Sequence, residues 1–321
     1  MKAIVQDQYG PADVLHVEDI EEPVAGAGEV LVRVLAASAF IGDWHIATGL
    51  PYAIRAVSGL RAPKNRVRGQ DFAGRVEAVG ERVTRFQPGD DVFGTCHGSF
   101  AEYATAREDK IAPKPANLTF GQAATVPSTG TTALQGLRNV GKIQPGHKVL
   151  IIGAAGGVGS FAVQIAKAFG AHVTGVCSTT KVDLVRSIGA DDVIDYTRDD
   201  FTDVGHTYDL ILDTAGNRPV SHLRRALALR GTLVIGGGEG GGRWLGVGRQ
   251  LRASMLSPFV SQRLGTFIAK PNREDLLVLK ALIEADKITP VIGSTYPLSE
   301  VPDAIRQLGE GHGRGKVVIE I

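Results

Sequence analysis

A glycine-rich turn between an apolar run and an amphipathic segment constrains the fold of this chain more than any other feature. The apolar run 149–152 leads into four glycines within residues 153–159, and residues 160–170 then place apolar side chains at helical spacing. This is the order of a strand, a tight turn and a helix. Glycines let a pyrophosphate approach the helix N-terminus, where N–H groups and the helix dipole favour an anion. The pattern predicts a dinucleotide-binding turn; the alternative is a glycine-rich turn in another α/β protein.

Strand and helix patterns alternate after this turn. Strands are expected at 171–176, 192–195, 209–213 and 232–235, and helices at 180–187 and 219–228. Repeated βα units predict a parallel, doubly wound sheet that binds its ligand at the carboxyl ends of its strands.

The rest of the chain predicts a second domain. Short β-type runs separated by turns before residue 105 are typical of a compact β-barrel-like domain. Helices are expected at 272–285, with Asn272 as N-cap, and at 299–308, with Ser299 as N-cap. The last residues form a strand that needs a partner sheet, which we expect in the first domain. The predicted division is 1–120 with 287–321, and 121–286.

Charge and cysteine content exclude several classes of function. Lys and Arg number 35 and Asp and Glu number 34, so no basic excess points to nucleic acid or to a membrane surface. The N-terminal residues resemble a strand and not a targeting segment, and no apolar run approaches the length of a membrane span. Two cysteines, Cys96 and Cys177, provide no disulfide framework. We expect a cytoplasmic protein without membrane insertion.

The segment after the second strand of the predicted dinucleotide fold indicates the cofactor. In NAD-preferring folds, an Asp or Glu about twenty residues past the glycines binds the ribose 2′-OH. Residues 177–181 read Cys-Ser-Thr-Thr-Lys, which supplies hydroxyls and a cation but no carboxylate. This composition favours NADPH over NADH. The alternative, that Ser178 and Thr179 cap the next helix and Lys181 is solvated, is compatible with phosphate binding.

In the order of its motifs, the whole chain resembles the medium-chain dehydrogenase/reductase superfamily. It looks most like the zinc-independent quinone oxidoreductase branch with its reticulon-4-interacting-protein-like members. The resemblance is carried by residues 69–80, 88–94, 98–103, 127–133, 155–159, 270–276 and 314–318.

The resemblance implies a GroES-like β-barrel domain, a Rossmann domain and a cleft between them that binds NADP(H). It implies that Thr132 lies near the nicotinamide, that the glycine turn holds the pyrophosphate, and that the segments after residues 235 and 266 line the nicotinamide pocket. The implied cofactor-binding residues are Thr132, Gly153, Ala155, Gly156, Gly157, Val158, Gly159, Ser178, Thr179, Lys181, Tyr196, Gly236, Gly237, Phe267 and Ile268.

The predicted substrate pocket departs from the family at one position. Many quinone reductases carry an Asn where this chain has Phe40. Phe40 offers an apolar wall to a flat substrate, or packs into the core. Trp44 is expected to stack on a planar ring or to lie in the core. Asp43 is expected to orient this loop or cap a turn.

The sequence predicts an active site without metal. Catalytic zinc needs three protein ligands. The resemblance places Gln70 where zinc-dependent relatives have a His, and no Cys lies at 38–44 or 128–131. Cys96 and His97 are adjacent, but no second Cys or His pair accompanies them.

These observations predict an NADPH-dependent reductase of quinones or α,β-unsaturated carbonyls, because hydride addition to an electron-poor π system needs little acid assistance. Tyr52 is the candidate proton donor and water the alternative. Two other functions stay open: a non-catalytic NADPH-binding redox sensor or scaffold, and a zinc alcohol dehydrogenase. The family also implies a homodimer. Residues 236–248 are either a loop over the cleft or a surface loop.

Overall fold

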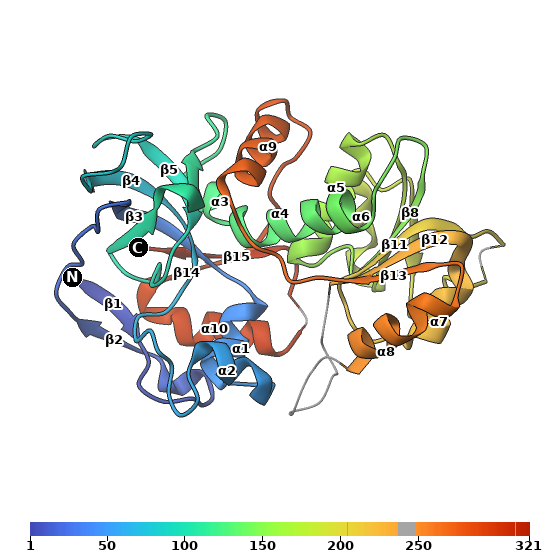
Figure 1. The fold of residues 1–321 in the computed structure, drawn as a ribbon, viewed down its shortest axis with the longest axis horizontal. Helices are drawn as coiled ribbons and strands as arrows, with labels where there is room; N and C mark the ends of the chain where they lie inside the picture. Colours follow the sequence, from blue (N-terminus) through green and yellow to red (C-terminus); the bar gives the residue numbers. More distant parts are fainter. Residues whose placement is uncertain (204, 237–247, 312) are drawn as a thin grey trace. The chain divides into compact units, whose positions relative to one another are not determined.

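A computed structural model describes residues 1–203, 205–236, 248–311 and 313–321. The chain divides into two compact units (Figure 1). The first comprises residues 1–131, 271–285 and 290–321, and the second comprises residues 132–270 and 286–289. Compared with the predicted division, residues 121–131 and 271–285 group with the first unit, and residues 287–289 group with the second. The boundaries of independently folding domains stay a prediction.

Most of the first unit is built on one large sheet. Among the described residues its strand order is β14–β15–β3–β4–β5–β7, with β6 paired to β3, and β1 and β2 form a separate antiparallel pair. The strands are β1 (Lys2–Val5), β2 (His16–Asp19), β3 (Glu29–Ala39), β4 (Asp71–Val79), β5 (Asp91–Thr95), β6 (Tyr103–Arg107), β7 (Ile111–Pro113), β14 (Ile292–Pro297) and β15 (Lys316–Glu320).

The last strand returns to the N-terminal sheet, as predicted. β15 pairs antiparallel with β3, with Val317 opposite Ala39, and parallel with β14. Alternate side chains of β3 and β15 enter the core of this unit together with Phe72 and Phe100. The last strand stays in this sheet because pairing there buries its apolar side chains in the core.

The helices of the first unit confirm one predicted cap and correct another. Asn272 caps α9, because its side chain accepts the N–H of Asp275 at 2.9 Å. Ser299 is not an N-cap: it lies inside a short 3₁₀ turn, and α10 begins two residues later with Glu300 as its cap residue. The helices are α1 (Ile41–Thr48), α2 (Arg55–Ser58), α3 (Phe120–Ala124), α9 (Arg273–Glu284) and α10 (Val301–Gly309), with α4 (Pro127–Leu134) at the boundary of the two units.

A parallel sheet forms the second unit, in agreement with the alternating pattern. In the part of the chain that the structure describes, its order is β10–β9–β8–β11–β12–β13. The strands are β8 (Lys148–Ile152), β9 (His172–Cys177), β10 (Asp192–Asp195), β11 (Tyr208–Asp213), β12 (Leu227–Ile235) and β13 (Arg263–Thr266).

Helices cover both faces of this sheet. α5 (Gly157–Ala168) and α6 (Val182–Ser187) lie on one side, and α7 (Val220–Ala226) and α8 (Gly248–Leu256) lie on the other (Figure 1). Side chains from alternate strand positions, including Leu150 and Ile211, join Leu223 and Ala253 in one core. The ends of the central strands are therefore fixed by burial on both faces.

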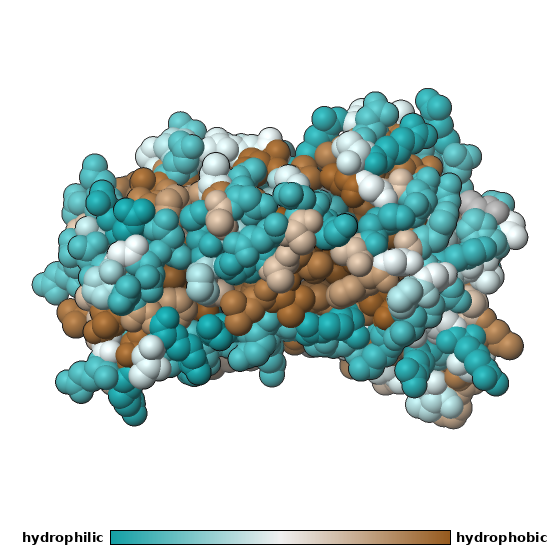
Figure 2. Space-filling view, turned by 90° about the horizontal axis from the view of Figure 1, so that it is seen from above, coloured by the Kyte–Doolittle hydropathy of each residue, from teal (hydrophilic) through white to brown (hydrophobic). Residues whose placement is uncertain are grey.

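The surface is mixed in character. Hydrophilic residues cover much of the face drawn in Figure 2, and hydrophobic residues emerge between them. No helix within the described ranges is long and apolar enough to cross a bilayer.

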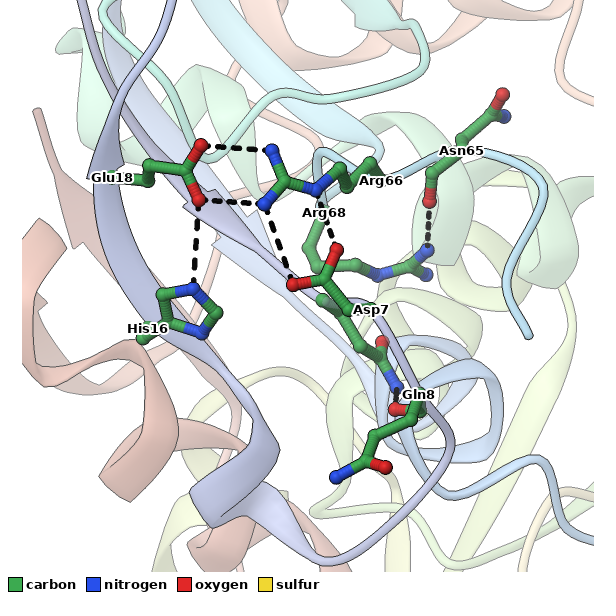
Figure 3. Close-up of polar contacts among 8 residues, drawn as sticks. Asp7, Gln8, His16, Glu18, Asn65, Arg66 and Arg68 are labelled. Carbon is green, nitrogen blue, oxygen red and sulfur yellow. Dashed lines mark hydrogen bonds and ion pairs between the residues drawn. The ribbon is translucent and has the colours of Figure 1, made fainter.

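An exposed charge cluster ties the chain before β4 to the N-terminal strand pair. Arg66 donates to Asp7 at 2.5 Å and to Glu18 at 2.6 Å, and His16 lies 3.6 Å from Glu18 (Figure 3). Such exposed pairs fix local geometry more than they stabilise the fold.

Candidate functional site

The glycine turn has the backbone geometry that an anion-binding turn requires. Gly153 follows β8 with φ at 84°, a conformation that favours glycine. Gly156 is the extended N-cap residue of α5, and Gly157 begins the helix. Residues 156–158 are partly exposed, whereas Ala155 and Gly159 are buried. The free N–H groups at the start of a twelve-residue helix therefore lie at an accessible surface.

Two glycines of the turn are required by close packing. A β-carbon on Gly159 would lie 2.0 Å from the carbonyl oxygen of Gly153, and one on Gly153 would lie 2.6 Å from Oγ1 of Thr214. On Gly156 it would lie 3.3 Å from its nearest neighbour, again the carbonyl oxygen of Gly153, so this position is less crowded than the other two. The turn thus fits the pyrophosphate of a dinucleotide, with Gly156 and Val158 at the exposed rim.

Residues predicted to line the nicotinamide pocket meet at the carboxyl ends of β11, β12 and β13. The N–H of Gly236 donates to the carbonyl oxygen of Asp213 at 2.9 Å. The ring of Phe267 would lie 3.8 Å from a β-carbon on Gly236 and 3.1 Å from one on Gly136. Gly136 belongs to a π-helical stretch (Gln135–Val140) that follows α4, the helix of the half-buried Thr132.

The other predicted residues of this region differ in exposure. Ile268 is 88% exposed, so its side chain is solvated in the structure described. Gln135 fixes the segment after Phe267, because its amide donates to the carbonyl oxygen of Lys270 at 3.0 Å and accepts the Lys270 N–H at 3.2 Å. Gly237 and most of the glycine-rich run 236–248 lie outside the described residues.

A buried ion pair that the sequence did not reveal lies at the same sheet edge. Asp213, fully buried at the end of β11, pairs with Arg249 in the first turn of α8. Its other oxygen accepts the N–H groups of Ala215 at 3.2 Å and Gly216 at 3.1 Å. The guanidinium Nε and Nη1 of Arg249 are buried without a partner among the residues described. The pair anchors α8 to the strand next to the glycine turn.

The residues predicted to determine the preference for NADPH over NADH follow the end of β9. Ser178 is half-buried and makes no capping hydrogen bond to the short 3₁₀ turn Thr179–Lys181 that follows it. The alternative in which Ser178 caps the following helix is therefore wrong, since Lys181 is the cap residue of α6. Tyr196 follows β10, donates its N–H to the carbonyl oxygen of Cys177 at 3.1 Å, and exposes 47% of its surface.

The structure adds a carboxylate to this end of the sheet. Asp195 lies opposite Cys177 in the pairing of β10 with β9. The hydroxyl of Thr179 donates to Oδ2 of Asp195 at 2.5 Å, which lowers the pKa of that carboxyl. Residues 177–181 predict that no carboxylate lies at this end of β9. That prediction is wrong, because Asp195 on the neighbouring strand supplies one.

Phe40 and Asp43 together begin α1 in the first unit. Asp43 is buried, and its carboxylate accepts the N–H of Phe40 at 3.0 Å, so the predicted turn-orienting role is confirmed. Burial raises the pKa of Asp43 to about 6. The half-buried ring of Phe40 lies over Gly42, and the ammonium of Lys316 lies 5.6 Å from its centroid.

A second buried carboxylate lies close to this loop. Asp71 accepts the backbone N–H of Ser128 at 3.2 Å and its hydroxyl at 2.5 Å, at the N-terminus of α4. Burial raises the pKa of Asp71 to about 7, although the positive charge of Lys316 acts to lower it. Lys316, from β15, is itself 2% exposed, and burial lowers its pKa. Asp71 and Lys316 lie 245 residues apart, so no local pattern predicts that their charges interact.

Trp44 and Tyr52, the other predicted pocket residues, have different surroundings. Trp44 is partly buried and packs against the core, over Gly309 of α10. This favours the core role that the sequence left open. Tyr52 is 39% exposed, and its ring lies 4.9 Å from the guanidinium carbon of Arg55. The pocket roles of Phe40, Trp44 and Tyr52 remain predictions.

Potential metal ligands are dispersed in the described ranges. No group of three or more His, Cys, Asp and Glu side chains there could hold a metal ion. Cys96 is packed against the core, and burial raises the pKa of its thiol.

The fold and glycine turn define a class of protein: a dinucleotide-binding α/β unit joined to a β-rich unit. The model of the alcohol dehydrogenase GroES-like domain matches residues 26–116. The model described as zinc-binding dehydrogenase matches residues 188–319.

Relatives that match over nearly all of this chain show the type of dehydrogenase that it resembles. It is 34% identical to the mitochondrial NAD(P)H oxidoreductase RTN4IP1 of Bos taurus, over all of this chain and 89% of the relative. It is 33% identical to the chloroplastic NADPH-dependent alkenal/one oxidoreductase of Arabidopsis thaliana, over 99% of this chain and 79% of the relative.

Solved structures agree with this placement. The quinone oxidoreductase of Coxiella burnetii has a TM-score of 0.85 at 30% identity, covering 100% of this chain and 99% of that one. The Escherichia coli quinone oxidoreductase complexed with NADPH has a TM-score of 0.85 at 25% identity, covering both chains fully. The chain belongs to the medium-chain dehydrogenase/reductase superfamily, in its quinone oxidoreductase branch, and is an NAD(P)H-dependent oxidoreductase.

Proposed function

We propose that this protein reduces quinones or α,β-unsaturated carbonyls with NADPH. The observation that carries the proposal is the glycine turn, whose accessible helix N-terminus is flanked by the Phe267–Gly236 cluster on one side and by Ser178 and Lys181 on the other. Three inter-strand steps of about 4.8 Å separate β9 from β12, which is about 14 Å along the sheet edge. An extended dinucleotide can therefore contact all three groups.

The preference for the phosphorylated cofactor rests on the end of β9. Ser178 supplies a hydroxyl. Burial raises the pKa of the Cys177 thiol to about 11, and the positive charge of Lys181 acts on the same thiol in the opposite direction. Hydroxyl and ammonium groups are donors for a phosphate. The E. coli relative of known structure is complexed with NADPH, which supports the same choice here.

The substrate class follows from the chemistry available to the chain. Reduced nicotinamide, when bound, supplies a hydride. The protein must then hold an electron-poor acceptor and deliver a proton. The cation of Arg55 lies over the ring of Tyr52, and we assign the Tyr52 hydroxyl the role of proton donor. Phe40 supplies an apolar surface in the same unit. The alkenal/one oxidoreductase and the quinone oxidoreductases among the relatives are named for acceptors of this kind.

The test is oxidation of NADPH by the purified protein with a panel of quinones and enones, followed by absorbance, with NADH as the comparison. The expected result is saturable turnover with at least one acceptor and a higher kcat/KM with NADPH. Saturable NADPH binding without turnover on any acceptor would establish the sensor or scaffold instead. Stoichiometric zinc, together with loss of alcohol oxidation on chelation, would establish the zinc alcohol dehydrogenase.

Assembly and location are part of the same proposal. We propose a cytoplasmic homodimer that acts on small molecules and binds no nucleic acid. Sedimentation at several concentrations measures the first property, and cell fractionation the second. A monomer at all concentrations would contradict the dimer without affecting the proposed reaction.

A further inference from the structure

Asp195 lies at the centre of a polar cluster near the end of β9. Its Oδ2 accepts the hydroxyl of Thr179 at 2.5 Å, and its Oδ1 accepts the hydroxyl of Thr197 at 2.7 Å and the Thr197 N–H at 3.0 Å. Arg198 lies 3.7 Å from Oδ2. The Asp195 side chain is only 12% exposed, so these groups hold it in one position.

The hydrogen bonds within this cluster determine whether the two hydroxyls can donate a hydrogen bond to a ligand or only accept one. A hydroxyl has one proton to donate and two lone pairs. Thr179 and Thr197 both direct that proton to Asp195, although their oxygens lie 3.0 Å apart. Thr179 therefore presents an acceptor, which suits a ribose 2′-OH and not a 2′-phosphate.

The negative charge of Asp195 also disfavours a 2′-phosphate at this position. It raises the pKa of Cys177, although less than burial does, which places the charge within electrostatic range of the last residue of β9. Lys181 and Arg186 act on the same thiol with the opposite sign. The end of β9 thus carries an anion among cations, and the anion opposes the phosphate that the cations attract.

We propose that Asp195, acting through Thr179, is a specificity-determining residue that limits the preference for the 2′-phosphorylated cofactor and lets NADH compete with NADPH. This inference rests on the proposed function, because it assumes that the adenosine end of the cofactor binds at β9. Asp195 is a positioning residue on β10 and lies outside the motif at 177–181.

The experiment compares two fragments by titration calorimetry: adenosine 2′,5′-bisphosphate, which carries the 2′-phosphate, and 5′-AMP, which has the free 2′-OH. We expect Asp195→Asn to strengthen bisphosphate binding relative to 5′-AMP by about tenfold, since neutralising a nearby charge has an effect of this order. The gain should shrink in about 1 M salt, where the Debye length is about 3 Å.

Two matched variants separate charge from structure. Asp195→Glu keeps the charge and should leave the affinity ratio within about twofold of the wild-type value. Asp199→Asn removes an exposed carboxylate outside the Thr179–Thr197 cluster and should also leave the ratio unchanged. Thermal melting checks that each variant is folded.

The outcomes distinguish this inference from the proposed function. A wild-type protein that binds both fragments, with an unchanged ratio in a folded Asp195→Asn variant, would overturn the role of Asp195 and leave the function intact. Equal weakening of both fragments in that variant would show a merely structural role and overturn it too. A wild-type protein that binds neither fragment would overturn the function and this inference together.

Discussion

The carbonyl oxygen of Gly153 would lie 2.0 Å from a β-carbon on Gly159. The first turn of α5 is therefore packed directly on the end of β8, and the accessible helix N-terminus is held at the edge of the sheet. Each additional atom at position 159 must push the helix away from the strand, whereas a β-carbon at position 156 requires a shift of only a few tenths of an ångström from its nearest neighbour at 3.3 Å.

Gly159→Ala is expected to reduce both stability and cofactor affinity, because overpacking of this kind costs about 1–3 kcal/mol. Gly156→Ala should reduce cofactor affinity with little change in melting temperature. Calorimetry and thermal melting measure the two effects. Gly28→Ala, at a surface glycine with nothing within 4 Å of its β-carbon, is the control. A Gly159→Ala protein with normal melting would contradict the packing argument.

Lys181→Met is expected to weaken NADPH binding by about tenfold relative to NADH, because one charge-assisted contact to a phosphate contributes about 1.4 kcal/mol or more. The measurement is the ratio of the two dissociation constants by fluorescence titration. Lys148→Met, which removes an exposed cation at the start of β8, the end of that strand opposite the glycine turn, is the matched control. Equal loss of both cofactors in Lys181→Met would argue against a 2′-phosphate contact.

Tyr52→Phe is expected to lower kcat by about a hundredfold if the tyrosine donates the proton, which is the lower end of the range for general acids. NADPH affinity should not change. Steady-state oxidation of NADPH with the best acceptor provides the measurement. Tyr9→Phe is the control, because the Tyr9 ring also lies against Arg55, at 4.5 Å, whereas its hydroxyl donates to the carbonyl oxygen of Gly59. An unchanged kcat would assign the proton to water.

Asp71 should make stability depend on pH. Its pKa is raised from 3.8 to about 7 by burial, so the folded state holds this proton more tightly than the unfolded chain. The stabilisation is complete below about pH 4 and is lost as the pH rises to about 7, at up to about 1.4 kcal/mol per pH unit. Urea denaturation midpoints at pH 4 and 7 measure the effect.

Asp71→Asn should flatten this dependence, leaving the smaller contribution of Asp43, whose pKa of about 6 has the same sign. Asp203→Asn, at an exposed position, should behave like the wild type. A midpoint that falls equally between pH 4 and 7 in the wild type and in Asp71→Asn would show that the Asp71 carboxyl does not titrate in this range.

Local patterns predicted most of the fold. The strand at Asp192–Asp195 has the predicted bounds, and Asn272 caps α9 as expected, because alternation, helical spacing and capping depend on neighbouring residues. The predictions failed where a local sequence pattern is compatible with more than one secondary structure. The helix expected at 219–228 ends at Ala226, and β12 begins at Leu227.

The sequence by itself determined the glycine turn, the alternation of strands and helices after it, and the family to which the chain belongs. Tertiary structure alone decided which charges meet. Asp195 reaches Thr179 across 16 residues, and Lys316 acts on Asp71 from the far end of the chain. The physical reason is that local conformation follows from nearby side chains, whereas the pairing of distant groups follows from the order and register of strands, which are set by burial of the whole sheet.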